Sequence, residues 1–472
     1  MTLNFKLRNQ NIILIVVLLL FSSNKTIAQV DYKLWLQYNK VENSKKNSEY
    51  QSNTKGIYAF GNSETIKIAI KELQLGLNGM LNQTTKQLSD SSLDNIIIIG
   101  NASNLNTDLN QNCKKELSAI NDEGFIIKTI TLNKKKQILI TAKTDTGVLY
   151  GVFHFLRLLQ TDQSISNLAI VDAPKINVRI LNHWDNLDAT VERGYAGSSI
   201  WNWQKLPDFI DQRYIDYARA NASIGINGTV LNNVNANALI LTPQYLEKVT
   251  ALANTFRPYG IKVYLTARFS APIEIGGLKT ADPYDKEVQQ WWKDKAAEIY
   301  KSIPDFGGFV VKANSEGQPG PQNYGRNHVD GANMLADALA PFGGIVMWRA
   351  FVYSEHDADD RAKQAYSEFV PYDGKFRDNV IVQVKNGAID FQPREPFHPM
   401  FGAMPKTPLM MEFQITQEYL GFSTHLVFLP KLYQEVLESD TYSKGKGSTV
   451  AKIIDGSLEN HKLTGIAGVA NI

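Results

Sequence analysis

The chain has 472 residues, of which 43% are hydrophobic and 20% are charged, so it is long enough to bury more than one hydrophobic core. Its 49 Lys and Arg residues nearly balance its 47 Asp and Glu residues, and no basic run is long enough to follow a phosphate backbone. The composition therefore excludes an intrinsically disordered chain and argues against a nucleic-acid partner.

Residues 1–28 are typical of a secretory signal peptide. Lys6 and Arg8 precede an apolar run from Ile12 to Phe21, and Thr26-Ile27-Ala28 offers a small-residue cleavage site. The apolar run is shorter than the roughly 20 residues that a membrane-spanning helix needs. We therefore expect cleavage, with a retained anchor as the alternative, and no membrane contact by the mature chain.

The cysteine content also favours an exported protein. Cys113 is the only cysteine of the chain, so no intramolecular disulfide can form and packing must supply the stability. An exported protein without disulfides suits a bacterial periplasm, and we expect a periplasmic or extracellular protein.

Residues 29–170 have mixed α/β character and are predicted to form a smaller N-terminal domain. Asn95–Gly100 is apolar on both faces, which is typical of a fully buried strand. Gly124–Ile130 and Gln137–Thr141 are rich in β-forming residues, and the polar stretch between them suits a hairpin. Apolar residues recur at helical spacing in Thr146–Gln160, so we expect this helix to cover the sheet.

In residues 171–472, short apolar strands alternate with helical patterns such as Gln244–Phe256, Lys286–Ile303 and Val329–Leu339. This alternation indicates repeated βα units and a parallel sheet. The candidate strands begin near Val178, Thr229, Ile261, Gly308, Gly344, Asn379, Leu409 and Gly465. Eight such units predict an α/β fold with a closed (β/α)8 TIM barrel. An open doubly wound sheet is the alternative, although the Gly-rich phosphate-binding fingerprint is absent.

Carboxylates follow three of the eight predicted strands. In a barrel of this kind the active site lies at the carboxyl ends of the strands. Glu316 stands in a Gly- and Pro-rich turn after strand four, while Asp390 and Glu418 follow strands six and seven. Converging carboxylates repel each other, but glycoside hydrolysis needs one protonated acid and one ionised base. The alternative is that each carboxylate caps a helix or pairs with a nearby cation.

Three cations follow strands four, five and six, namely Lys312, Arg349 and Lys385. They are expected to line one side of the barrel mouth with positive charge. Because Arg binds a planar carboxylate through two hydrogen bonds and Lys adds a point charge, a sugar acid fits this lining better than a neutral sugar. The alternative is that the cations only neutralise the three carboxylates.

Tryptophans near strand ends are candidate platforms for sugar rings. Trp184 follows the first strand, and Trp201, Trp203 and Trp348 lie near other strand ends, where flat apolar faces can stack on a pyranose. Taken singly, each is more often a core residue. The sequence has no His-Glu-x-x-His motif and no Cys/His cluster, so we expect no catalytic metal. It has no Gly-x-Ser-x-Gly elbow either.

Several long strings of this sequence resemble glycoside hydrolase family 67, the xylan α-glucuronidases. They are KANSEGQPGP at 312–321, NG at 386–387 with DFQPREP at 390–396, EFQITQEY at 412–419, NHWDN at 182–186 and ERGYAG at 192–197. The resemblance implies an inverting hydrolysis that needs no cofactor. Its product is glucuronic or 4-O-methylglucuronic acid, released from an α-1,2 bond to the terminal xylose of xylooligosaccharides.

The resemblance also implies a role for each matching residue. Glu316 resembles the general acid that protonates the leaving oxygen. Asp390 and Glu418 resemble the pair that holds and activates water, and which of the two is the base stays open. The positions that match the substrate-binding residues are Trp184, Lys312, Arg349 and Lys385. Inverting carboxyl groups stand roughly 6.5 to 9.5 Å apart.

The sequence departs from the family at its end. Family members continue into a helical C-terminal domain, whereas this chain stops at Ile472, so the resemblance implies that the last barrel helix and that domain are missing. We therefore expect a homodimer only if the domain is present. Two other functions stay open: an inactive protein that binds uronosyl-oligosaccharides, and a TIM-barrel glycosidase of another specificity.

Overall fold

A computed structural model gives the fold and describes residues 33–192, 197–351, 361–389, 391, 395–415 and 428–470. The signal peptide predicted at residues 1–28 lies outside this part of the chain. Within it, no helix is both long and apolar enough to cross a lipid bilayer.

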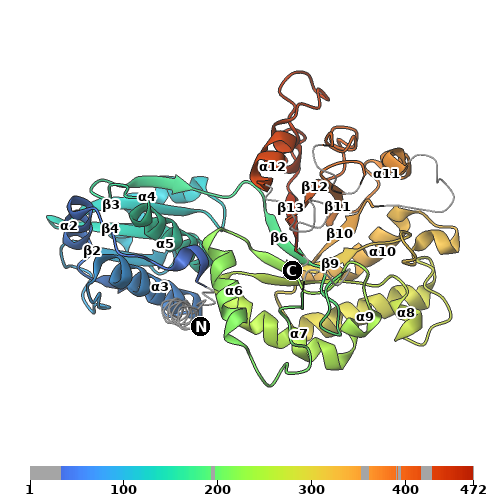
Figure 1. Cartoon of the computed structure of the whole chain (residues 1–472), viewed down its shortest axis with the longest axis horizontal. Coiled ribbons are helices and arrows are strands. Elements are labelled where there is room, and N and C mark those ends of the chain that lie inside the picture. The colour runs from blue at the N-terminus through green and yellow to red at the C-terminus, as the bar shows by residue number, and fades with distance from the viewer. Residues whose placement is uncertain are drawn as a thin grey trace, which may run out of the picture. The chain divides into compact units, whose positions relative to one another are not determined.

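The N-terminal part of the chain forms a five-stranded mixed sheet with the strand order β1-β2-β4-β3-β5 (Figure 1). Its strands are β1 (Ile57–Ala59), β2 (Ile96–Asn101), β3 (Phe125–Leu132), β4 (Lys135–Ala142) and β5 (Ala169–Asp172). β2 is fully buried and parallel to β4, while β3 and β4 form an antiparallel hairpin. Both predicted features are thereby confirmed. Asn133 and Lys134 make the tight turn with φ angles of 50° and 65°, as a two-residue hairpin loop requires.

Helices cover both faces of this sheet. They are α2 (Ser44–Asn53), α3 (Glu64–Leu81), α4 (Thr107–Ala119) and α5 (Asp145–Gln160), and a short 3-10 helix, η1 (Leu34–Leu36), precedes them. α5 confirms the predicted helix, and the Thr144 hydroxyl caps it by accepting a hydrogen bond from the Gly147 N–H. Side chains of α4 pack with Ile96 and Ile98 of β2. Because strand side chains alternate, the residues between them face the opposite side.

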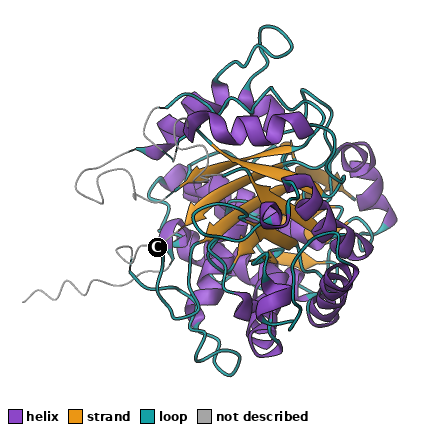
Figure 2. Ribbon diagram, turned by 90° about the vertical axis from the view of Figure 1, so that its right-hand side faces the viewer, coloured by secondary structure: helices purple, strands orange, loops and turns teal. Residues whose placement is uncertain are grey.

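The second part of the chain is a closed barrel of eight parallel strands, so the open-sheet alternative is wrong. The strands are β6 (Val178–His183), β7 (Gly228–Val230), β8 (Lys262–Thr266), β9 (Gly308–Val311), β10 (Ile345–Arg349), β11 (Val380–Lys385), β12 (Leu409–Gln414) and β13 (Gly465–Ala470). All eight match predicted strands. β13 pairs with β6 and closes the barrel, and Figure 2 shows the strands enclosed by helices.

Helices connect the barrel strands. The α-helices are α6 (Gln212–Ser223), α7 (Pro243–Phe256), α8 (Ala271–Glu274), α9 (Lys286–Ser302), α10 (His328–Leu339), α11 (Arg361–Phe369), α12 (Leu429–Glu438) and α13 (Val450–Ile454). The 3-10 helices are η2 (Ala238–Leu241), η3 (Arg257–Tyr259), η4 (Pro321–Tyr324), η5 (Ala340–Phe342) and η7 (Val370–Tyr372). α7, α9 and α10 confirm the three predicted helices to within one residue at each end.

The barrel interior changes from apolar to polar toward the carboxyl ends of the strands. Apolar side chains fill the lower interior, including Val310, Met347 and Met410. Inward-facing residues alternate along a strand, so the next inward positions lie two residues further on. The next inward positions, on or directly after the strands from β9 to β12, are all buried. They are Lys312, Arg349, Gln383, Lys385 and Glu412. The two-residue period therefore brings the charged side chains together.

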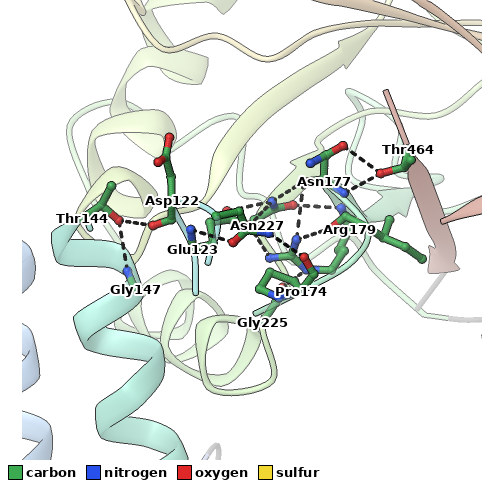
Figure 3. Close-up of polar contacts among 12 residues, drawn as sticks. Asp122, Glu123, Thr144, Gly147, Pro174, Asn177, Arg179, Gly225, Asn227 and Thr464 are labelled. Carbon is green, nitrogen blue, oxygen red and sulfur yellow. Dashed lines mark hydrogen bonds and ion pairs between the residues drawn. The ribbon is translucent and has the colours of Figure 1, made fainter. Parts of the chain in front are cut away.

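Hydrogen bonds join the N-terminal sheet region to the end of the barrel at which the strands begin (Figure 3). The Glu123 carboxylate accepts hydrogen bonds from Arg179 on β6 at 2.7 Å and from the Asn227 amide at 2.9 Å. The Asn227 oxygen in turn accepts from the Arg179 backbone N–H at 2.9 Å. The Glu123 side chain is only 25% exposed, which favours these charge-assisted hydrogen bonds.

Candidate active site

Three buried cations converge around one aromatic ring at the carboxyl ends of neighbouring strands. The Lys312 Nζ lies 5.3 Å from the centroid of Phe351, the Arg349 guanidinium 5.4 Å and the Lys385 Nζ 3.1 Å. Each cation is at most 4% exposed. The structure thus brings together the three cations that the sequence places after strands four, five and six. Phe351 offers them a cation–π partner that the sequence analysis did not identify.

Arg349 forms a buried ion pair with Glu412 on β12. Its Nε donates to Glu412 Oε2 at 2.8 Å and its second terminal nitrogen donates to Oε1 at 2.5 Å. Gln383 adds a third hydrogen bond to this carboxylate at 2.6 Å. Burial acts to raise the pKa of Glu412, but Arg349 and then Lys385 outweigh it and hold the pKa below its ordinary value. Glu412 therefore neutralises Arg349 inside the barrel.

Glu412 and Gln383 were missed by the sequence analysis as site residues. Glu412 stands within a motif string, but it lies on a strand and not in the loop after it. The signal that identifies it is its place two residues after the inward-facing Met410. A search for polar residues at inward positions of the strands would have found both residues.

Lys312 connects the cation group to Glu316. Its ammonium donates hydrogen bonds to the Glu316 carboxylate and, at 2.8 Å, to the Asn235 side-chain oxygen. Burial lowers the pKa of Lys312, and so does Arg349, while Glu316 acts in the opposite direction. The Lys312 side chain is 2% exposed and that of Glu316 is 38% exposed. Glu316 therefore lies at the solvent-facing edge of a buried cationic group.

The backbone of the Glu316 loop is held in an uncommon conformation. Asn314, Glu316 and Gly317 have φ angles of 56°, 48° and 74°. Residues other than glycine occupy this left-handed region at a cost of about 1–2 kcal/mol, often at functional sites. The two non-glycine residues here include the carboxylate at the barrel mouth, so the loop conformation is consistent with a functional role for Glu316.

Trp184 belongs to the same cluster of side chains. Its ring lies 5.7 Å from the Arg349 guanidinium and 6.3 Å from the ring of Phe391. Trp184 is itself buried, with an exposed fraction of 5%, and packs at the edge of the barrel core. The other candidate platforms are buried as well, and their exposed fractions are 0% for Trp201, 2% for Trp203 and 0% for Trp348. Of the four tryptophans, only Trp184 lies beside the cations.

Asp390 and Glu418 lie outside the described residues, so the convergence of three carboxylates stays a prediction. The described neighbour of Asp390, Phe391, has its ring 4.5 Å from the Lys385 Nζ. Among the side chains that the structure describes, no three His, Cys, Asp or Glu residues form a group that could hold a metal ion. The described arrangement can bind an anionic group and present one carboxylate to it.

Comparisons with known proteins show the family to which the chain belongs. Residues 34–155 match the model described as "Glycosyl hydrolase family 67 N-terminus", and residues 158–472 match "Glycosyl hydrolase family 67 middle domain". The chain is 41% identical over 416 residues to a probable alpha-glucuronidase A of Aspergillus fumigatus, which covers 87% of this chain and 49% of that protein. It is 38% identical over 476 residues to an alpha-glucuronidase of Hypocrea jecorina, with coverage of 97% and 55%. The chain thus spans about half the length of these relatives.

A solved structure shares the fold at low sequence identity. It is described as a "GH138 enzyme targeting pectin rhamnogalacturonan II" and matches with a TM-score of 0.52 and 16% identity, covering 87% of this chain and 46% of that one. At this identity the likeness supports the fold alone.

Proposed function

Since the chain belongs to glycosyl hydrolase family 67, we propose that it is an α-glucuronidase that acts in xylan degradation. The observation that carries the proposal is the group of three buried cations beside the partly exposed carboxylate of Glu316. The names of two similar proteins, alpha-glucuronidase and probable alpha-glucuronidase A, support the same activity.

We propose that the cation group binds the carboxylate of a uronic acid. Lys312 and Lys385 contribute point charges, while Arg349 is oriented by its bond to Glu412. Trp184 supplies a flat face beside the guanidinium. The substrate that meets these demands is glucuronic or 4-O-methylglucuronic acid, α-1,2-linked to the terminal xylose of a xylooligosaccharide.

The contact between Lys312 and Glu316 suggests how the acid acquires its proton. Without substrate the two side chains neutralise each other. When a uronate binds Lys312, Glu316 loses its cationic partner and gains a nearby negative charge, so its partly exposed carboxylate can take up a proton from solvent. We propose that Glu316, protonated in this way, donates its proton to the leaving oxygen.

Hydrolysis with inversion needs a second carboxylate that activates water on the opposite side of the sugar. We propose Asp390 and Glu418 for this function, and either of the two can be the base. The proposal predicts that the first product released is the β-anomer of the sugar acid, because water attacks the α-linked carbon from the opposite face.

The test is release of the sugar acid from aldotetraouronic acid by wild-type protein and by Glu316→Gln. We expect the variant to lose about 100- to 10,000-fold of the activity. It should bind free glucuronic acid in calorimetry at least as tightly as wild type, because the sugar acid no longer competes with the Glu316 carboxylate for Lys312. Glu298→Gln on the outer helix α9 serves as the control and should behave like wild type. Near-normal release by Glu316→Gln would contradict the assignment. Binding by wild type without any release would instead favour a uronosyl-oligosaccharide-binding protein.

We also propose that the protein is exported, on the strength of residues 1–28 alone. Expression in a Gram-negative host with the natural N-terminus, followed by fractionation, tests it. Sequencing of the periplasmic or secreted protein should give a mature N-terminus near Gln29. A full-length chain that stays in the membrane fraction would indicate a retained anchor.

A further inference from the structure

His328, the first residue of α10, contacts side chains of three other elements, namely β10, η4 and α11. Its Nδ1 accepts a hydrogen bond from the Trp348 indole N–H at 3.1 Å. Its Nε2 lies 2.8 Å from the side-chain amide of Gln322 in η4 and 3.0 Å from the Glu368 carboxylate on α11. The His328 side chain is only 2% exposed. Solvent therefore cannot replace these partners.

These partners fix the protonation of the ring. An indole N–H only donates, so Nδ1 of His328 must carry its lone pair. The neutral ring then holds its proton on Nε2 and donates it to Glu368. Two N–H groups cannot bond to each other, so the Gln322 amide presents its oxygen to Nε2 and shares this proton; no other described residue bonds to that oxygen. Burial acts to raise the pKa of Glu368, but the hydrogen bonds from His328 and Gln364 together outweigh it and the pKa lies below its ordinary value. The imidazole thus has one accepting and one donating side.

The donating side faces the loop that carries Glu316. Glu316 itself is bonded to Lys312. Further along the loop, the Gln318 amide oxygen accepts from Arg268 at 3.0 Å, and the Gly320 N–H donates to the Asn323 side chain at 2.8 Å. Gln322 provides the contact with His328. The direction of the Glu316 carboxylate therefore depends in part on an anchor that lies six residues away.

The accepting side faces the strand that carries Arg349, because Trp348 is its direct neighbour on β10. The first turn of α10 packs closely here. A Cβ added to Gly331 would lie 2.8 Å from the Trp348 ring and 3.1 Å from Pro321. A contact this close leaves little space for either element to move.

We propose that His328 is a positioning residue with two separable functions. Through Nε2 it fixes the loop of Glu316, and through Nδ1 it fixes the strand end of Arg349. This inference rests on the proposed function, in which Glu316 is the acid and Arg349 helps bind the uronate. Misplacement of a reacting group by about 1 Å can cost roughly 100-fold in rate, so a residue outside the site can limit turnover.

Two substitutions separate the functions, because a Gln amide nitrogen can replace the Nε2 donor and an Asn oxygen can replace the Nδ1 acceptor. For His328→Ala we expect kcat to fall about 10- to 100-fold and KM to rise about tenfold. His328→Gln should restore kcat to within about threefold of wild type but leave KM raised. His328→Asn should restore KM but not kcat.

The experiment uses the full chain, with kinetics on aldotetraouronic acid and calorimetry with glucuronic acid. His154→Gln, a partly buried histidine in α5 of the N-terminal sheet region, is the control and should match wild type. If wild type is active and His328→Gln and His328→Asn lose kcat alike with unchanged KM, His328 is merely structural and the inference is wrong. A wild-type protein that binds glucuronic acid without releasing it contradicts the proposed function instead. In that case the affinity for glucuronic acid must still fall in His328→Gln and recover in His328→Asn for the inference to hold.

Discussion

At the scale of single residues, the ion pair of Arg349 and Glu412 has the largest consequences. Both side chains are 1% exposed, and the carboxylate engages the guanidinium through two hydrogen bonds. A buried pair gains little over an apolar pair, but the loss of one partner leaves a buried charge without compensation. The pair therefore holds Arg349 in place, but replacement of either partner should destabilise the folded protein.

We predict that Glu412→Gln lowers the free energy of unfolding by about 3–5 kcal/mol. Asp337→Asn is a matched control, because Asp337 forms a similar two-bond pair with Arg377 and both side chains are about half exposed. That control should cost no more than about 1 kcal/mol. Urea unfolding of the three proteins at pH 7 gives the comparison. Equal losses in the two variants would show that burial does not matter here.

His398 gives the stability of the protein a specific pH dependence. Burial, and secondarily Lys385, lowers its pKa to about 4, against about 6.5 in an unfolded chain. Its Nδ1 accepts a hydrogen bond from the Met400 N–H at 3.1 Å. Because the folded-state pKa is depressed, the stabilisation is complete above pH 6.5 and is lost as the pH falls toward 4.

We predict that the wild type loses about 2 kcal/mol more than His398→Asn when the pH falls from 7.5 to 5. Asn keeps an acceptor near the position of Nδ1 but does not titrate. The measurement is the free energy of unfolding in urea at both pH values. The prediction fails if both proteins lose the same amount.

At the scale of elements, the close approach of β9 and β10 places two of the three cations side by side. Gly308 begins β9 with a φ of 134°, and a Cβ at this position would lie 1.9 Å from the carbonyl oxygen of Ile345. No other residue type can take this position without moving a strand. The glycine thus allows the close pairing of β9, which leads into Lys312, with β10, which ends at Arg349.

We predict that Gly308→Ala destabilises the protein by more than about 3 kcal/mol and lowers the yield of soluble protein. Gly343→Ala is the matched control, since its φ is 76° and no atom lies within 4 Å of the added Cβ. It should cost about 1–2 kcal/mol. Thermal unfolding monitored by circular dichroism tests the difference, and a Gly308→Ala variant as stable as Gly343→Ala would refute it.

At the scale of the whole molecule, Glu123 connects two hydrophobic cores. Its carboxylate holds Arg179 of the first barrel strand and Asn227 before the second (Figure 3). The sequence supplies a separate reporter for each core. Cys113, the only cysteine, is buried in α4, which covers the N-terminal sheet. Six of the seven tryptophans lie in the barrel region between residues 184 and 348.

We predict that thiol exposure at Cys113 and tryptophan fluorescence report one common urea transition in the wild type. In Glu123→Ala the loss of a partly buried partner should separate the two midpoints, with Cys113 becoming reactive first. Glu64→Ala, which removes an exposed carboxylate at the start of α3, is the control. Coincident transitions in Glu123→Ala would show that other contacts couple the cores.

The sequence by itself determined the eight strands, the four helices that it predicted and the order of the two parts, because these depend on local periodicity. It also placed Lys312, Arg349 and Lys385 at strand ends, because each of them comes at the end of a short apolar run. The closed barrel predicted from these eight units is confirmed. The gathering of the three cations around Phe351 and the bond of Arg349 to Glu412 were decided only by the tertiary structure. Each joins residues that are far apart in the chain, and local pattern carries no information about which distant side chains share one buried space.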